Sequence, residues 1–242
     1  MRYEIREIVD VAKRVEKAGI PIVWENIGDP VFKGEVPPVW MKKIVANAVK
    51  EDMTFAYSPS KGLDETREYI ARERNKERGI QISADDILFF NGLGDAISHL
   101  YRNLNPKARI IGPDPAYPTH SSAEAAHADK PHITYHLDPE NVWKPDLADM
   151  EAKIRRHKDI AGILIVNPDN PTGFVYPQKT IRAIVALAKK YKLFIISDEI
   201  YSNLAYQGSG MKKLASVIDG VPGIAMRGIS KEFPWPGARS GW

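Results

Sequence analysis

Residues 162–173 read GILIVNPDNPTG, a short apolar run that ends in a turn rich in asparagine, aspartate, proline and glycine. The run at 162–166 is typical of a strand that is buried on both faces. A helix-like segment follows at 177–191, where Pro177 suits the first helical turn, and a second apolar run, LFIIS, follows at 193–197. Two such strands joined by a helix predict a parallel pair with the helix packed against it.

The same alternation extends in both directions along the chain. Further β-prone runs lie at 87–90, 109–112, 132–136 and 223–227, and further helix-like segments lie near 94–104, 118–128 and 146–157. Toward the N-terminus we expect a helix from Ile5 to Val15, a second after Pro37-Pro38, and a charged surface helix over 64–78. The sequence therefore predicts an α/β fold with a mainly parallel central sheet and helices on both faces.

Composition excludes several classes of function. The 242 residues carry 34 lysine and arginine against 31 acidic residues, a net charge of +3 that is interspersed rather than clustered, so no nucleic-acid partner is predicted. The chain contains no cysteine, which excludes disulfides, thiolate metal sites and a cysteine nucleophile. No apolar run approaches the roughly 20 residues that a membrane-spanning helix needs, and the N-terminus lacks the apolar core of a signal peptide. We expect a cytoplasmic protein with no membrane partner.

Polar loops follow the predicted strands, at the sheet edge where ligands of α/β proteins bind. NGLGDAI at 91–97 could cradle a phosphate on the first turn of a helix, or could be a plain tight turn. It is half of a dinucleotide fingerprint, but Ile97 occupies the third glycine position. NPDNPTG could be a rigid loop whose side chains only satisfy the backbone, and Asp198 could be a helix cap.

Lys231 is the strongest candidate for chemistry on these grounds alone. It lies between the 223–227 run and a loop that contains Phe233 and Trp235. A lysine removed from solvent loses its proton more easily and can form an imine with an aldehyde. Arg239 follows in the same loop, and its planar guanidinium suits a phosphate.

Together these loops resemble a known family. NPDNPTG, SDEIYSNLAY (197–206) and SKEFPWPGAR (230–239) are similar to the signatures of fold-type I pyridoxal-phosphate (PLP) enzymes, specifically class I/II aminotransferases. ENIGDP (25–30), YSPSKG (57–62), NGLGDA (91–96) and DPAYP (114–118) fit the same family in the same order. The resemblance covers the chain from about Ile22 to Trp242.

The resemblance implies a role for each matching residue around PLP. Lys231 would form the imine with PLP and then move the proton between the substrate and the cofactor. Asp198 would face the pyridine nitrogen and keep it protonated, so that the ring accepts electrons. Tyr201 and Asn170 would hydrogen-bond the 3′-oxygen of the ring, and Tyr117 would stack on its face.

Other matching residues would hold the phosphate and the substrate. The resemblance assigns the phosphate to the N–H groups of Leu93 and Gly94, to Arg239 and to Ser230; Gly228 stands where some relatives carry a phosphate-binding serine. Tyr57 would reach the phosphate of the neighbouring subunit, which implies a homodimer with shared active sites. Gly28, through its backbone, and Asn170 would contact the substrate. No metal site is predicted: we interpret His127, His132 and His136 as packing or surface residues rather than as a metal cluster.

By the resemblance, residues 1–50 form the N-terminal part of a small domain, and residues 51–242 form a PLP-binding large domain that is truncated. The family pattern continues beyond this point, so we expect the free 1–242 chain to be incompetent in amino transfer. The implied activity is an aminotransferase that moves an amino group between an α-amino acid and a 2-oxo acid. The alternatives are another fold-type I PLP enzyme, such as a C–S lyase, decarboxylase or synthase, or a non-catalytic aminotransferase-like binding domain.

Overall fold

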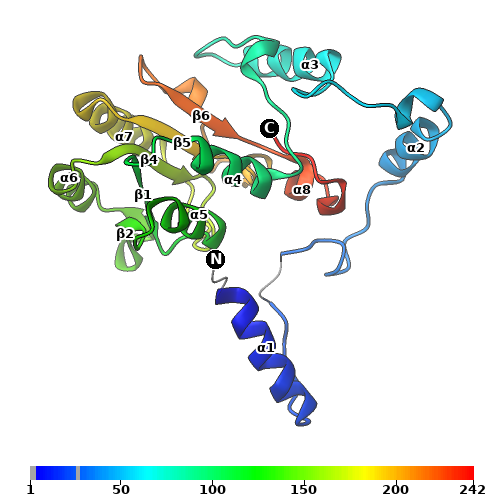
Figure 1. Cartoon of the computed structure of the whole chain (residues 1–242), viewed down its shortest axis with the longest axis horizontal. Helices are drawn as coiled ribbons and strands as arrows, with labels where there is room; N and C mark the ends of the chain where they lie inside the picture. Colours follow the sequence, from blue (N-terminus) through cyan, green and yellow to red (C-terminus); the bar gives the residue numbers. More distant parts are fainter. Residues whose placement is uncertain (1–3, 26–27) are drawn as a thin grey trace.

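A parallel sheet forms the centre of the computed structural model, which describes residues 4–25 and 28–242 (Figure 1). Within these residues six strands pair in the order β3-β2-β1-β4-β5-β6. Their bounds are β1 Arg109–Asp114, β2 Ile133–Asp138, β3 Lys144–Pro145, β4 Ile160–Val166, β5 Phe194–Asp198 and β6 Gly223–Met226. Every neighbouring pair is parallel except β3, which runs antiparallel to β2. The predicted fold class is confirmed.

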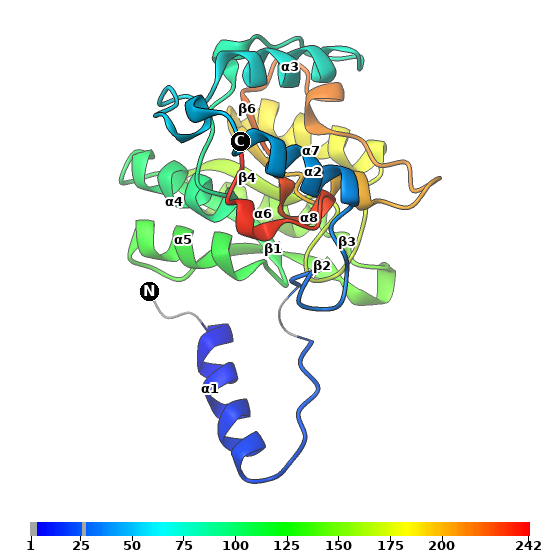
Figure 2. The same ribbon diagram turned by 90° about the vertical axis from the view of Figure 1, so that its right-hand side faces the viewer.

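Helices cover both faces of this sheet (Figure 2). Helices α6 and α7 pack on one face, and helices α4 and α5 pack on the other. In chain order the helices are α1 Glu4–Lys17, α2 Val39–Ala48, α3 Asp64–Asn75, α4 Leu93–Asn103, α5 Pro118–Ala128, α6 Leu147–Arg156, α7 Gln178–Tyr191 and α8 Ile229–Glu232. The helices predicted from the sequence all occur, with boundaries shifted by a few residues, whereas α8 was not predicted.

Successive residues of each central strand enter opposite cores. Ile111, Ile163 and Ile195 pack with α6 and α7. Their neighbours Ile110, Leu164 and Ile196 pack with α4 and α5. All six side chains are almost wholly buried, and full burial of each contributes roughly 1.5–3 kcal/mol. This two-sided burial explains why the strands appear in the sequence as continuous apolar runs.

The prediction of a strand at 87–90 was wrong, because these residues do not form a regular strand. Only Phe90 forms a bridge, antiparallel to Gly241, and Gly241 in turn bridges Gly228. The preceding Phe89 donates its N–H to the carbonyl of Lys61 instead. A ladder needs a partner over several residues, and here the segments at Lys61 and at Gly241 each pair with a single residue of the run. Strand β3 was missed because two residues carry no periodic signal.

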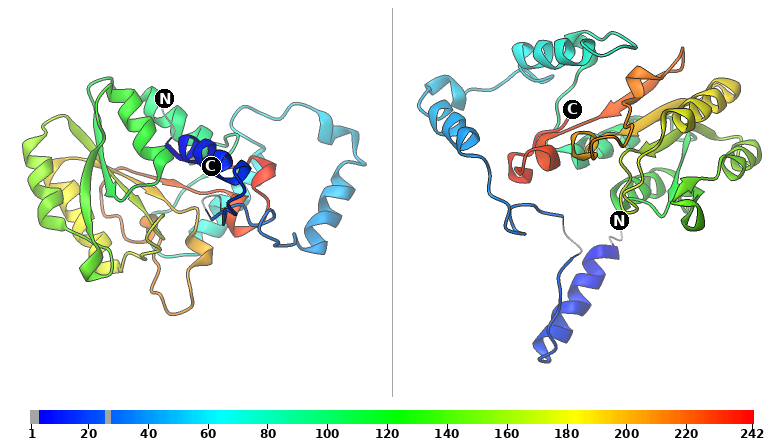
Figure 3. Two further views of the ribbon diagram at one scale, coloured as in Figure 1. Left: turned by 90° about the horizontal axis from the view of Figure 1, so that it is seen from below. Right: turned by 180° about the vertical axis from the view of Figure 1, so that it is seen from behind.

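Helices α1 and α2 lie outside the α/β body (Figures 1 and 3). Several of their apolar side chains are exposed, among them Ile8 on α1 and Trp40 and Ile44 on α2, whereas Met41 of α2 is buried. The placement of Asn26 and Ile27, in the ENIGDP motif, lies outside the described residues. The division into two domains near residue 50 stays a prediction.

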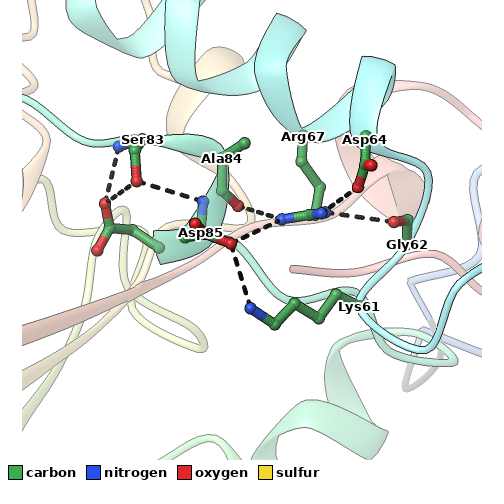
Figure 4. Close-up of polar contacts among 8 residues, drawn as sticks. Lys61, Gly62, Asp64, Arg67, Ser83, Ala84 and Asp85 are labelled. Atoms are coloured by element: carbon green, nitrogen blue, oxygen red, sulfur yellow. Dashed lines mark hydrogen bonds and ion pairs between the residues drawn. The ribbon is translucent and has the colours of Figure 1, made fainter.

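The buried Arg67 side chain connects the charged helix α3 to the neighbouring loops. The Arg67 side chain donates to the carbonyls of Gly62 at 3.2 Å and Ala84 at 2.6 Å, and it pairs with the Asp64 carboxylate (Figure 4). Arg67 and Ala71 are the buried residues of this helix. The helix is therefore a surface helix, as predicted, and it is held to the 83–86 turn by a cation each of whose three nitrogens donates a hydrogen bond.

A second buried arginine joins α5 to β1. Arg109 Nε donates to Glu124 Oε1 at 2.6 Å, and its Nη2 donates to Glu124 Oε2 at 3.1 Å and to the Pro131 carbonyl at 2.6 Å. Glu124 is completely buried and Arg109 is 6% exposed. Solvent reaches neither charged group, so each charge must be stabilised by the other.

We predict that Arg109→Met lowers the free energy of unfolding of the complete protein by about 3–5 kcal/mol, because it leaves the Glu124 carboxylate buried without its cation. The double change Arg109→Met with Glu124→Leu should cost clearly less, since no buried charge remains. Urea unfolding followed by circular dichroism measures both. Lys190→Met is the control, because its pair with Glu151 is exposed and should contribute less than about 1 kcal/mol. Equal losses from Arg109→Met and Lys190→Met would contradict the prediction.

Candidate active site

A cavity of about 200 Å³ lies at the carboxyl edge of the sheet, beside the ends of β4, β5 and α8. Nine residues that the sequence singled out line it: Leu93, Gly94, Tyr117, Asn170, Asp198, Tyr201, Ser230, Lys231 and Arg239. Ile97, Val166, Ile200 and Pro236 complete the wall. A larger, more open hollow of about 720 Å³ lies beyond Arg239. It contacts neither Lys231 nor Asp198, so the smaller cavity is the candidate site.

Asp198 ends β5 and is almost wholly buried. Its Oδ1 accepts the N–H of Ile200 at 3.0 Å, and its Oδ2 lies 3.1 Å from Nε2 of His120. His120 is itself completely buried between the rings of Tyr101 and Tyr117. A buried carboxylate requires such partners. The helix-cap alternative for Asp198 is not what the structure shows, because no helix begins there.

His120 is the site residue that the sequence reasoning missed. It follows Tyr117 by one helical turn at the start of α5, so the two side chains share a face of the helix. That spacing was the available signal. The contact with Asp198 joins residues that are 78 positions apart in the sequence, and nothing local to DPAYPTH reveals it.

Asn170 and Tyr201 form a pair on the wall of the cavity. Nδ2 of Asn170 donates to the hydroxyl of Tyr201 at 3.2 Å. Burial raises the pKa of Tyr201, Tyr117 and the Asp198 carboxylate raise it further, and the bond from Asn170 opposes the rise. The phenol therefore keeps its proton and can donate a hydrogen bond to an acceptor in the cavity.

The N-terminus of α4 faces the same cavity. Its N-cap, Gly92, has a φ of 85°, and a Cβ there would collide with the Arg239 guanidinium. Arg239 donates to the carbonyl of Asn91 at 3.2 Å. Gly94 has open space on its Cβ side. First-turn N–H groups lack intrahelical partners, so this helix end and the adjacent arginine have the chemistry that suits an anion.

Lys231 lies on the short helix α8 and is partly buried. Its Nζ donates to the carbonyl of Gly28 at 2.5 Å, which brings the N-terminal segment to the cavity. Burial lowers the pKa of Lys231, and the nearby carboxylate of Asp29 opposes this by raising it. Ser230 lines the cavity beside it. At Gly228 a Cβ would lie 2.8 Å from the Ser240 carbonyl oxygen, so no side chain fits there without a shift.

Tyr57 lies away from this cavity and is fully exposed in the chain. The three histidines weighed as a metal cluster have separate surroundings. His127 contacts the Ala108 carbonyl, His132 is shielded enough for burial to lower its pKa, and His136 is exposed. Within residues 4–25 and 28–242, no three metal-binding side chains gather at one point, and no helix combines the length and apolar character needed to cross a membrane.

We predict that the Lys231 amine, in cofactor-free protein, titrates below the ordinary lysine value of about 10.4, because burial disfavours its charged form. Asp29→Asn should lower this pKa further, since Asp29 stabilises the ammonium. The pH dependence of amine acylation, followed peptide by peptide with mass spectrometry, measures it. Lys190 is an internal control: its bond to Glu151 raises its pKa. A Lys231 midpoint at or above that of Lys190 would count against the site geometry.

The sequence is similar to those of known aminotransferases. Residues 22–242 match the family model for aminotransferase class I and II. The whole chain is 58% identical to an uncharacterized aminotransferase of Methanocaldococcus jannaschii, of which it covers 56%. It is 31% identical to the glutamate-pyruvate aminotransferase AlaA of Escherichia coli, with 99% of the chain and 58% of that protein aligned.

The fold gives the same result. The structure of an alanine aminotransferase from Pyrococcus furiosus superposes with a TM-score of 0.90 and 34% identity, over 99% of this chain and 60% of that one. The chain thus spans little more than half the length of these relatives. By its sequence and its fold, the chain belongs to the aminotransferase class I and II family.

Proposed function

We propose that the protein containing this chain is a PLP-dependent aminotransferase that moves an amino group between an α-amino acid and a 2-oxo acid through a lysine imine. One observation carries the proposal: Lys231, the buried Asp198 and the Asn170–Tyr201 pair line a single cavity, although they lie on separate segments. An amine, a buried carboxylate and a pair of hydrogen-bonding side chains are what chemistry on a pyridine aldehyde needs.

The residues present fit PLP, which supplies an electron sink for the carbanion that forms at the substrate Cα. In the proposal Asp198 would hold a protonated ring nitrogen, because an opposite charge favours the protonated form. His120 fixes one oxygen of that carboxylate and the Ile200 N–H fixes the other. The carboxylate therefore cannot rotate away from the cavity without losing both bonds.

The remaining polar groups divide between the ring oxygen and the phosphate. In the proposal Asn170 and Tyr201 donate to the 3′-oxygen, and Tyr117 covers one ring face. The phosphate is assigned to the first-turn N–H groups of Leu93 and Gly94, to Ser230 and to Arg239. A helix N-terminus with an adjacent guanidinium supplies backbone donors and positive charge together.

Lys231 acts first as the attachment point and then as the proton carrier. Either task needs the neutral amine, and burial lowers its pKa in that direction. In the cofactor-free chain its ammonium is held by the Gly28 carbonyl. Gly28 therefore lies beside Lys231, and in the proposal its backbone and Asn170 would contact the substrate.

The proposal extends to assembly and substrate. Residues 1–50 are assigned to a small domain and residues 51–242 to the PLP-binding large domain. Tyr57 is assigned to the phosphate site of a second subunit, and its complete exposure in one chain supports that assignment. The names of the two relatives that specify substrates make alanine, glutamate and the corresponding 2-oxo acids the first pairs to test.

Lys231 provides the direct test of the proposed function. We predict that PLP added to the complete protein gives an imine absorbance band, and that borohydride fixes the label on the peptide that contains Lys231. Lys231→Ala should retain non-covalent PLP but lose amino transfer, since both the attachment point and the proton carrier are gone. Lys213→Ala is a matched control, because Lys213 pairs with Glu77 away from the cavity. Label on another lysine, or none, would refute the proposal.

Shared active sites are tested by hybrid dimers. In the proposed dimer each site takes Lys231 from one subunit and Tyr57 from the other. Mixing Tyr57→Phe with Lys231→Ala subunits should therefore restore one intact site per hybrid, with turnover near the wild-type value for that site. Activity is measured on hybrids purified through two different affinity tags. A hybrid no more active than Tyr57→Phe alone would rule out a site built from both chains.

A further inference from the structure

Asp169 is a buried acidic residue that none of the roles above uses. It lies in the loop after β4 and is 4% exposed. Its Oδ2 accepts two hydrogen bonds from Thr172, one from the backbone N–H at 3.2 Å and one from the hydroxyl at 2.6 Å. The Thr172 hydroxyl also accepts the N–H of Phe174 at 3.2 Å. One carboxylate oxygen thus fixes the position of the residue that ends the turn.

The Asp169 backbone closes the same loop. Its N–H donates to the Phe174 carbonyl at 2.8 Å, and its carbonyl accepts the N–H of Gly173 at 3.0 Å. Together with the two bonds from Thr172, these contacts connect Asp169 at the start of the loop to residues 172–174 at its end. Asn170 is the first residue inside the closed loop, so the direction of its Cα–Cβ bond follows from this closure.

Asn170 is the residue through which the closure reaches the cavity. Its side chain lines the cavity and donates to the Tyr201 hydroxyl at 3.2 Å. A hydrogen bond weakens steeply as its angle departs from linearity, so a small rotation of the loop misaligns the amide. The alignment is needed only if Asn170 serves the site, so the inference below rests on the proposed function.

We propose that Asp169 is a positioning residue, whose carboxylate closes the 169–172 turn and thereby aims the Asn170 amide at Tyr201 and at the 3′-oxygen of the cofactor. The role requires an acceptor at Oδ2, not a negative charge. Burial raises the pKa of Asp169, and the bonds from Thr172 oppose that rise. Its Oδ1 is buried and has no hydrogen-bond partner among the described residues. The two hydrogen bonds that Thr172 donates therefore reach one carboxylate oxygen only.

Two substitutions separate acceptor from charge. Asp169→Asn removes the charge but keeps an oxygen that can accept both bonds from Thr172. Asp169→Ala removes the charge and the acceptor together. Any direct effect of the carboxylate's charge on the site is therefore common to both variants, and the difference between them reports the positioning of Asn170.

The readout is the pH midpoint of the imine absorbance band of the complete, PLP-loaded protein. A donor to the 3′-oxygen stabilises its negative charge and so lowers the pKa of the imine. When Asn170 is misaligned that pKa rises. We expect Asp169→Ala to titrate about one pH unit above Asp169→Asn, which corresponds to the loss of about one hydrogen bond. Thr172→Val should shift the midpoint in the same direction.

A matched control tests for general destabilisation. Asp146 likewise accepts two hydrogen bonds on one oxygen, from the backbone N–H groups of Ala148 and Asp149, but it caps α6 away from the cavity. Asp146→Ala should lower the melting temperature and leave the imine midpoint unchanged. An Asp169→Ala shift reproduced by Asp146→Ala would overturn the positioning role.

The remaining outcomes distinguish failure of the Asp169 positioning role from failure of the proposed function. If Asp169→Ala and Asp169→Asn titrate together while the wild type shows the band, the inference fails and the proposed function stands. If the wild type forms no band, the proposed function fails and the inference fails with it. If Asp169→Ala shows no cooperative melt, Thr172→Val decides in its place, and a midpoint equal to the wild type would overturn the inference.

Discussion

The burial of the Asp198 carboxylate is the constraint around which the site is arranged. An ionised side chain at the end of a strand with both faces covered is costly unless hydrogen bonds replace its water. His120 and the Ile200 N–H supply those bonds, one to each oxygen. Placing His120 there requires α5 to begin at Pro118, directly after the turn that follows β1. The position of α5, which follows β1, thus depends on a carboxylate at the end of β5, two places from β1 in the sheet.

Close backbone contacts bring the lysine segment to this carboxylate. A Cβ at Gly241 would lie 2.8 Å from the Leu93 nitrogen, and a Cβ at Gly228 would lie as close to the Ser240 carbonyl oxygen. Glycine at both positions lets the segment around α8 pack directly on the first turn of α4. Lys231 and the N-terminus of α4 therefore line one cavity because glycines leave no side chains between the two segments.

Sequence alone predicted the parts whose causes are local. The central strands were recognisable because burial on both faces gives an apolar residue at every position, and the loops after them because turn chemistry is written in adjacent residues. The 87–90 run failed as a strand because its ladder depends on the segment near Gly241. His120 was missed for the same reason: its partner lies 78 residues away. The roles proposed for Asp198 and Asn170 came from motif resemblance, since no periodicity encodes a cofactor contact, whereas the position of Lys231 already indicated imine chemistry.

The contact between Lys231 and Gly28 links the N-terminal segment to the protonation of the lysine. The Gly28 carbonyl accepts a bond from the ammonium, and the Asp29 carboxylate raises the pKa of the same group. Both interactions favour the charged lysine, so by linkage a charged lysine favours the docked segment to the same extent. Burial acts on the amine in the opposite direction. A neutral or covalently occupied Lys231 loses its charge-assisted bond, which is among the stronger single contacts a carbonyl can make.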